Sequence, residues 1–313
     1  MGLSYLALKQ NKSKPMGHER DWKQYNKHLI NRGKINLWIN PDAMKKWTPE
    51  RVKKNGRPFL YSNELIKILS CLRFRFRLSL RETEGFFQSF VSALKSLFRS
   101  PSYTQICRRM KTLKLPTELL TKKNITDIAL DTTGLKVYGE GEWRAEKYGG
   151  RKRWKKLHLA LDVESGKLII AEITDEYVHD TTYVEKALKI TGKRPGKILI
   201  DGIADSATCY RLAKKYNKVL LTPPKKGAIL RKEIEYESRN EAIRIIRGLG
   251  GDLTARSIWG KLVGYNRRVI AESMMARWKR LYGGDLKSRC AERSKIEVRL
   301  KAMLINTMID QVA

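Results

Sequence analysis

The spacing of hydrophobic positions divides the chain into a helical part, a strand-rich part and a second helical part. In residues 59–113, Leu65, Leu69 and Leu72 recur at the spacing of an amphipathic helix. In residues 124–222 the apolar residues form short runs of strand length, separated by turn residues. Helical spacing returns in residues 225–313. The pattern predicts an α/β layer fold with helical regions before and after it.

The strand-rich part has an order of elements that constrains its topology. Strands are expected at residues 125–131, 157–162, 168–173, 197–200 and 219–222, with helices near 181–188 and 206–216. Three meandering strands are thus followed by two crossovers through helices. This order predicts a mixed five-stranded sheet with helices on both faces. Further helices are expected at 237–249, 265–281 and 290–308.

Two capping boxes mark helix starts in the first helical part. Ser79 with Glu82, and Ser102 with Gln105, have the three-residue spacing of this motif. The second box opens a short helix, 103–112, that carries three basic residues: Arg108, Arg109 and Lys111. Short helices ending in a basic one indicate a helix-turn-helix-like DNA-binding unit. A plain helical bundle with a solvated basic face explains the pattern equally well.

We expect three regions in the chain. Residues 1–58 hold 14 Lys and Arg against 4 Asp and Glu, which predicts a basic arm with a short helix near 18–29. Residues 59–120 form the helical region, and residues 121–313 form the α/β domain.

The overall charge narrows the class of partner. The chain of 313 residues has 65 Lys and Arg against 32 Asp and Glu, a formal net charge of +33. Such an excess indicates a polyanionic partner, and nucleic acid is the default. No apolar stretch is long enough to span a membrane, and the N-terminus lacks a secretory signal. Four scattered cysteines without a Cys-x-x-Cys pair argue against a zinc site and indicate a reducing, cytoplasmic setting.

Two aspartates follow apolar strands in the α/β part. Asp131 ends the first expected strand and Asp201 follows the fourth. If these strands are parallel neighbours, both side chains lie at the carboxyl edge of the sheet, where α/β proteins bind ligands. Adjacent carboxylates repel unless a cation lies between them, and Mg²⁺ suits such oxygen ligands. Two such ions can activate an attacking oxygen and stabilise a leaving oxygen at a phosphodiester.

A third carboxylate lies on the helix expected at 265–281. Tyr265, Arg268, Glu272 and Lys279 have offsets of 0, 3, 7 and 14 residues, so they share one helical face. This face suits a metal ligand flanked by phosphate-binding side chains. An ordinary Arg268–Glu272 pair on a surface helix explains the spacing equally well.

This spacing is also the signature Tyr-x-x-Arg-x-x-x-Glu-x-x-x-x-x-x-Lys of one branch of bacterial insertion-sequence DDE transposases, which the chain resembles. The segments around Asp131, residues 139–143 and residues 304–308 are similar to that branch too. The resemblance covers roughly residues 35–310. It implies an insertion at about 223–258, before the Glu272 helix, with no role that the sequence indicates. It implies an RNase H-like catalytic core with Asp131, Asp201 and Glu272 as catalytic metal ligands for Mg²⁺, with Mn²⁺ as a substitute.

The resemblance implies a specific reaction. Such enzymes bind the terminal inverted repeats of a mobile element, cut at its ends and join the 3′-hydroxyls to target DNA. They do so as endonucleases without a covalent enzyme intermediate. Tyr265, Arg268 and Lys279 are carried over as DNA contacts. Two ends require two active sites, so a homodimer on double-stranded DNA is expected, in the bacterial cytoplasm and associated with the nucleoid.

Other polar residues have weaker claims. Asp127 and Asp162 are alternatives to Asp131, while Asp205 is interpreted as an N-cap or loop carboxylate and His158 as structural. The basic segment with Arg151, Lys152, Arg153 and Trp154 is expected to contact DNA, with Trp154 stacking on a base or packing under a hairpin. Two other functions stay open: a DNA-binding regulator without catalysis, and an RNase H-like nuclease that does not join strands.

Overall fold

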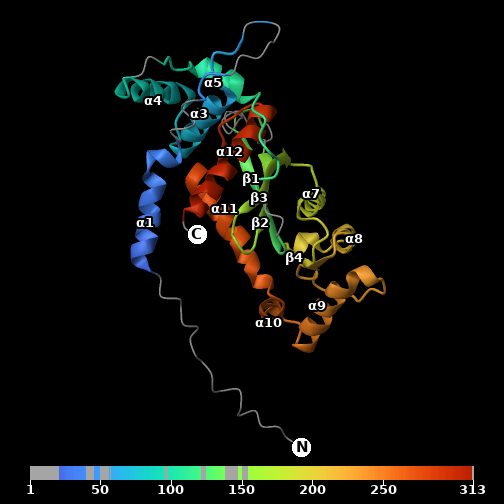
Figure 1. Cartoon of the computed structure of the whole chain (residues 1–313). Coiled ribbons are helices and arrows are strands. Elements are labelled where there is room, and N and C mark those ends of the chain that lie inside the picture. The colour runs from blue at the N-terminus through green and yellow to red at the C-terminus, as the bar shows by residue number, and fades with distance from the viewer. Residues whose placement is uncertain are drawn as a thin grey trace, which may run out of the picture.

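The computed structural model of the chain describes residues 21–39, 46–49, 56, 58–95, 98–120, 125–137, 147–149 and 154–311 (Figure 1). The loop at 139–143 and the predicted DNA contacts Arg151, Lys152 and Arg153 lie outside these ranges.

A mixed β-sheet forms the centre of the molecule. In the described residues it has six strands, in the order β3-β2-β1-β4-β5, with β6 also paired to β1. The strands are β1 (Ile128–Val137), β2 (Trp154–Asp162), β3 (Leu168–Asp175), β4 (Gly196–Leu199), β5 (Lys218–Leu221) and β6 (Asp285–Leu286). Strands β1, β2 and β3 form an antiparallel meander, whereas β4 and β5 run parallel to β1. The predicted five-stranded mixed sheet is confirmed, and the two-residue β6 is an addition that its short sequence does not indicate.

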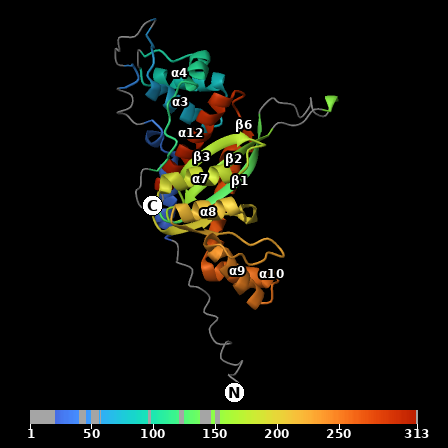
Figure 2. The same ribbon diagram turned by 90° about the vertical axis from the view of Figure 1, so that its right-hand side faces the viewer.

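Helices cover both faces of this sheet (Figures 1 and 2). Helices α7 (Thr181–Thr191) and α8 (Ala207–Lys215) pack on one face, and α11 (Val269–Tyr282) and α12 (Ala291–Asp310) pack on the other. Strand residues alternate between the faces, as a period of two requires. Ile128 and Leu130 of β1 join the α7–α8 cluster, while Ala129 and Leu135 join the α11–α12 cluster.

The N-terminal part is helical, as expected. It contains α1 (Trp22–Gly33), η1 (Ile35–Leu37), α3 (Asn63–Arg75), α4 (Leu80–Ala93) and α5 (Tyr103–Met110). Both predicted capping boxes are present at the starts of α4 and α5. The apolar face of α3 belongs to the same buried cluster as Leu300 and Leu304 of α12. The helical region is therefore packed directly on the α/β part; its definition as a separate domain stays a prediction.

The segment between β5 and α11 is also helical. It comprises η3 (Ile234–Tyr236), α9 (Glu237–Gly248), α10 (Leu253–Val263) and η4 (Tyr265–Arg268). Helix α10 was not predicted, although its N-cap Asp252 accepts a hydrogen bond from the Ala255 amide at 2.7 Å. The prediction of one continuous helix from 265 was wrong, because the first turn is a 3₁₀ turn and the α-helix begins at Val269. In Figure 2, α9 and α10 lie at the opposite end of the sheet from α3 and α4.

Within the described ranges, no helix combines the length and the apolar character needed to cross a membrane.

Candidate active site

Asp131 and Asp201 occupy equivalent positions on adjacent parallel strands. The register pairs Ile128 with Ile198 and Ala129 with Leu199, a constant offset of 70 residues. Asp131 and Asp201 have the same offset and lie two residues beyond the last paired position. The two carboxylates therefore lie side by side at the edge where β4 ends.

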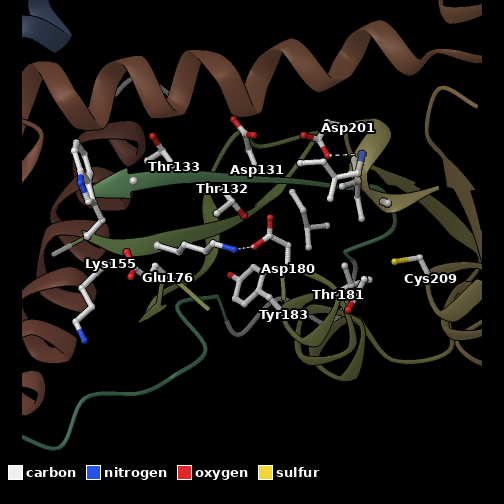
Figure 3. A pocket seen from close by; sticks show the side chains of 18 residues that line it. Asp131, Thr132, Thr133, Lys155, Glu176, Asp180, Thr181, Tyr183, Asp201 and Cys209 are labelled. Atoms are coloured by element: carbon white, nitrogen blue, oxygen red, sulfur yellow. Dashed lines mark hydrogen bonds and ion pairs between the residues drawn. The ribbon is translucent and has the colours of Figure 1, made fainter. Parts of the chain in front are cut away.

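Both carboxylates belong to the face of the sheet that α11 covers. Asp131 has the same parity as Ala129, and Asp201 the same parity as Leu199; both of these residues join the cluster under α11 and α12. Figure 3 shows Asp131 and Thr133 on one side of β1 and Thr132 on the other. The alternation of the strand thus directs the aspartates toward the helix that carries Glu272.

The predicted position of Asp131 at the end of a strand was wrong. Strand β1 continues six residues further, to Val137, because β2 pairs with it along its length. Only the pairing with β4 stops at Ala129. Asp131 therefore lies in the interior of β1, at the point where β1 separates from β4. The prediction assumed that both strands end at one edge of the sheet, but only β4 ends there.

Asp201 is oriented by the turn that follows β4. It is the N-cap of η2 (Gly202–Ala204), and its Oδ1 accepts a hydrogen bond from the Ile203 amide at 3.3 Å. The Thr222 hydroxyl, just after β5, donates to the Asp201 carbonyl at 2.6 Å. These contacts fix the backbone on both sides of the carboxylate.

Arg268 connects the sheet to Glu272. Its guanidinium donates to the Glu272 carboxylate one helical turn away, and its Nη1 lies 3.8 Å from Oδ1 of Asp131. The Arg268 side chain is only 16% exposed, whereas that of Glu272 is 54% exposed. The surface-pair interpretation accounts for the contact between these two residues but not for the approach of Arg268 to Asp131.

The pKa of the Asp131 carboxyl is raised. Burial is the main cause, because it removes water from the charged form, and the charges of Asp201 and Glu272 raise the pKa further. The Arg268 guanidinium and a hydrogen bond from the Thr132 amide oppose this shift. The three carboxylates therefore act on one another electrostatically, with Arg268 as a compensating cation.

In the sequence, Tyr265 precedes Arg268 and Glu272, and Lys279 follows them. The Tyr265 ring packs on Trp259 with centroids 5.4 Å apart, and the Arg268 guanidinium lies 6.0 Å from its centroid. Burial raises the pKa of the Tyr265 phenol. Lys279 is exposed and follows Glu272 by seven residues, which is about 10 Å along a helix axis.

Among the residues that the structure describes, no three His, Cys, Asp or Glu side chains gather closely enough to hold a metal ion. Asp131 and Glu272 instead share the Arg268 guanidinium, which supplies positive charge beside both carboxylates. Carboxylate oxygens are the ligands that Mg²⁺ and Mn²⁺ favour. The chemistry of the three carboxylates thus suits a hard divalent cation, whereas their arrangement here brings Arg268 to two of them.

A cavity of about 360 Å³ is bounded by β1, the residues that follow β4 and the first turn of α7 (Figure 3). Asp131 and Asp201 are among the residues that line it, together with Trp154, Tyr183 and the ion-paired Lys156 and Asp180. Trp154 is 38% exposed, so its ring is accessible from solvent. The cavity gives the carboxylate edge a recess with both aromatic and charged walls.

His158 has a structural environment. It is buried, its Nδ1 lies 3.0 Å from Thr132 Oγ1, and its Nε2 lies 2.7 Å from Thr174 Oγ1. Its ring stacks on Tyr183 at 4.9 Å. Burial lowers its pKa, which favours the neutral ring.

The other aspartates considered from the sequence have local partners. Asp127 pairs with Arg267 at 2.9 Å, and Asp162 accepts from the Ser165 amide at 3.1 Å in the β2–β3 turn. Asp205 is not an N-cap, because Ser206 caps α8. It is a buried carboxylate paired with Arg239 of α9 at 2.7 Å. No local pattern indicates that pair, because its partners are 34 residues apart.

The predicted basic contacts on α5 differ in their environment. Arg108 and Lys111 are exposed. Arg109 donates to the Tyr61 carbonyl at 2.8 Å and to Asn63 Oδ1 at 2.7 Å, so it joins α5 to the start of α3. Of the three predicted basic contacts, Arg109 therefore makes hydrogen bonds within the protein.

Comparison with known proteins agrees with this geometry. Two family profiles, each described as "Transposase DDE domain", match residues 30–140 and 122–307. The second match covers more than half of the chain and contains all three carboxylates. Among solved structures, the chain is similar to a piggyBac transposase synaptic complex with hairpin DNA, at 11% identity and a TM-score of 0.31, covering 90% of this chain and 81% of that one. Given the family match over the mixed sheet and its three carboxylates, the chain belongs to the DDE transposase family, with an RNase H-like core.

Proposed function

We propose that this transposase binds the terminal inverted repeats of an insertion sequence, cleaves at the element ends and joins the freed 3′-hydroxyls to target DNA. The observation that carries the proposal is the equal register of Asp131 and Asp201 on the face of the sheet covered by the helix of Glu272. A further support is the shared Arg268, which approaches Asp131 and pairs with Glu272.

In this proposal Asp131, Asp201 and Glu272 would hold Mg²⁺, with Mn²⁺ as a substitute. When bound, two such ions supply an activated attacking oxygen and charge stabilisation at the leaving oxygen. The carboxylates of Asp131 and Asp201 are fixed by the sheet, whereas Glu272 comes from the first turn of α11. The site thus combines two rigid ligands with one that depends on the placement of a helix.

Three side chains near the carboxylates would bind DNA phosphates. The Arg268 fork suits the oxygens of one phosphate. The raised pKa of Tyr265 keeps its hydroxyl protonated at neutral pH, so it donates a hydrogen bond. Lys279, further along α11, would contact the backbone farther from the cleaved bond. These groups hold the scissile strand while the carboxylate site acts on it.

Further DNA contacts are proposed at Arg108, Arg109 and Lys111 on α5, at Arg151, Lys152 and Arg153, and at Trp154, whose exposed ring suits stacking on a base. A homodimer on DNA follows from the need to cut two ends, because a symmetric pair of protomers provides one active site for each. Such a DNA-bound enzyme would be associated with the nucleoid.

The test uses the DNA that flanks the gene as substrate. Purified protein is incubated with this fragment, a labelled target and Mg²⁺, beside Asp131→Asn, Asp201→Asn and Glu272→Gln. We expect cleavage at inverted repeats and a joined product, both lost in the three variants while DNA binding remains. Asp175→Asn serves as the matched control, because this exposed carboxylate pairs only with Lys155 among the described residues.

Each other result points to a different function. Binding without cleavage by the wild-type protein would favour a regulator. Cleavage without a joined product would favour a nuclease of the same fold.

A further inference from the structure

Arg77 stands at a backbone position that favours glycine. Helix α3 ends with the Phe76 amide bonded to the Leu72 carbonyl and the Leu78 amide bonded to the Arg73 carbonyl, both at 2.9 Å. This is the Schellman pattern, in which the residue after the C-cap adopts a left-handed conformation. That residue is Arg77, with φ of 57°. A side chain is disfavoured there, so the contacts that the Arg77 guanidinium makes are of interest.

The guanidinium of Arg77 binds the far end of α11. Its Nη2 donates to the Arg280 carbonyl at 2.5 Å, and its Nε donates to the Leu281 carbonyl at 2.8 Å. The last carbonyls of a helix lack partners within the helix. The Gly283 amide donates a hydrogen bond to the Lys279 carbonyl at 2.8 Å, and the Arg77 guanidinium donates to the next two carbonyls of the helix. A side chain more than 200 residues away thus completes the C-terminus of α11.

Helix α11 also carries Glu272, at its other end. The Glu272 side chain is 54% exposed and pairs with Arg268 in the short η4 turn. Arg280 follows Glu272 by eight residues, which is about 12 Å along the axis. Two hydrogen bonds to consecutive carbonyls restrict both the sliding and the rotation of a helix. The Arg77 contact therefore bears on where Glu272 lies relative to Asp131 and Asp201.

We propose that Arg77 is a positioning residue that couples the N-terminal helices to the Glu272 ligand. Arg77 lies in the loop between α3 and α4, and α3 packs against both α11 and α12. DNA held by the N-terminal helices would in this way act on the placement of Glu272. This inference rests on the proposed function, because it assigns to Arg77 the positioning of Glu272, one of the proposed metal ligands.

The decisive variant is Arg77→Gly. Glycine suits the backbone of Arg77 and removes the side chain with its guanidinium. The relief of backbone strain should offset the two lost hydrogen bonds, so the Tm should stay close to that of the wild type. Arg77→Asn is a second variant, because asparagine tolerates this conformation but cannot reach α11. Lys95→Gly is the matched control: Lys95 follows α4 with φ of 50°, and substitution relieves its backbone without touching α11.

We expect Arg77→Gly and Arg77→Asn to bind element ends within about twofold of wild type and to cleave them at least about tenfold more slowly, as misplaced catalytic groups do. The Mn²⁺ concentration for half-maximal cleavage should rise in both, and Arg77→Lys should restore part of the rate. Amide hydrogen exchange within residues 269–282 should be faster in both variants but unchanged in Lys95→Gly.

Two results would overturn the inference: wild-type cleavage by Arg77→Gly, or a loss of DNA binding as large as its loss of cleavage. If even the wild-type protein failed to cleave, the proposed function would fail instead. Hydrogen exchange would then decide by itself whether Arg77 orders α11, since it requires neither DNA nor activity.

Discussion

At the scale of single residues, Arg268 contacts carboxylates that are proposed as metal ligands. Its guanidinium pairs with Glu272 and approaches Asp131, two of the three proposed ligands. A divalent ion that binds these carboxylates must therefore compete with it. Arg268→Gln should bind Mn²⁺ about tenfold more tightly than wild type in the absence of DNA, a difference of about 1.4 kcal/mol.

Electron paramagnetic resonance of free Mn²⁺ measures this affinity without any reaction. Arg267→Gln is the control, because it removes the same charge from the neighbouring residue, which pairs with Asp127 instead. Equal Mn²⁺ affinity in the two variants would mean that Arg268 does not compete for the carboxylates.

His158 gives stability a dependence on pH. Its folded-state pKa is lowered by burial, below the ordinary value of 6.5. The unfolded chain therefore binds a proton more readily, and stability falls as pH drops from 6.5 toward the lowered value. We expect the free energy of unfolding of His158→Gln to lose this part of its pH dependence, measured by urea titration between about pH 5 and 8.

The exposed His179 provides the comparison. His179→Gln leaves His158 in place, so the part of the pH profile that the buried His158 causes should remain. A profile for His158→Gln that matched the wild type would assign the acid sensitivity to other groups.

The sequence indicated the carboxylates but not their surroundings. Asp131 and Asp201 follow buried apolar runs, and Glu272 belongs to the spaced signature of the family that the chain resembles, so local pattern was enough to propose these three. The approach of Arg268 to Asp131 joins residues 137 positions apart and depends on how η4 meets the sheet. Contacts of this kind follow from tertiary packing, which spacing along the chain does not encode.

At the scale of elements, a buried ion pair joins α9 to the segment just before α8. Asp205 and Arg239 are 2.7 Å apart, with side chains 2% and 7% exposed, and Asp205 also accepts from the Lys225 amide at 2.9 Å. Arg239→Ala should lower the free energy of unfolding by about 3–5 kcal/mol, because it leaves a buried carboxylate without its cation.

Adding Asp205→Asn to Arg239→Ala should restore part of this loss, since the unpaired charge is then removed. Urea unfolding of the two single variants and the double variant forms the cycle that measures the coupling. Arg247→Ala is the control: it removes an exposed contact to the Ala228 carbonyl and should cost less than about 1 kcal/mol. Additive losses in the cycle would contradict the role of this ion pair.

Element prediction succeeded where the signal is local. The Ser79–Glu82 and Ser102–Gln105 boxes gave the starts of α4 and α5 to the residue, because the cap itself is a three-residue interaction. Helix α10 was missed although Asp252 caps it. Gly260 lies in its interior, and Leu253 and Leu262 are exposed, so its apolar residues do not follow a single helical face. The length of β1 was missed because it is set by pairing with β2.

At the scale of the whole molecule, the N-terminal helices and the sheet share one buried cluster. Side chains of α3 and α5 belong to it together with those of α11, α12 and alternate strand residues. The helical region and the helices that cover the carboxylates are therefore parts of one packed core. This continuity makes the Arg77 contact one part of a broader junction.

The charge of the whole chain predicts how DNA binding responds to salt. With 65 basic and 32 acidic residues, the chain has a net charge of +33 that its own acidic side chains do not balance. Each phosphate neutralised by a protein cation releases counterions, so affinity falls linearly with salt on logarithmic axes. Arg108→Ala with Lys111→Ala should reduce that slope by about 2 if both exposed cations of α5 contact phosphates.

Fluorescence anisotropy with an element-end duplex at about 50–200 mM salt measures the slope. Lys189→Ala with Lys215→Ala is the matched control, because it removes the same charge from two lysines that pair with Glu185 on the α7–α8 side of the sheet. The control should keep the wild-type slope. If both double variants reduced the slope equally, net charge would explain the salt dependence, and α5 would lose its assignment as a DNA-contacting helix.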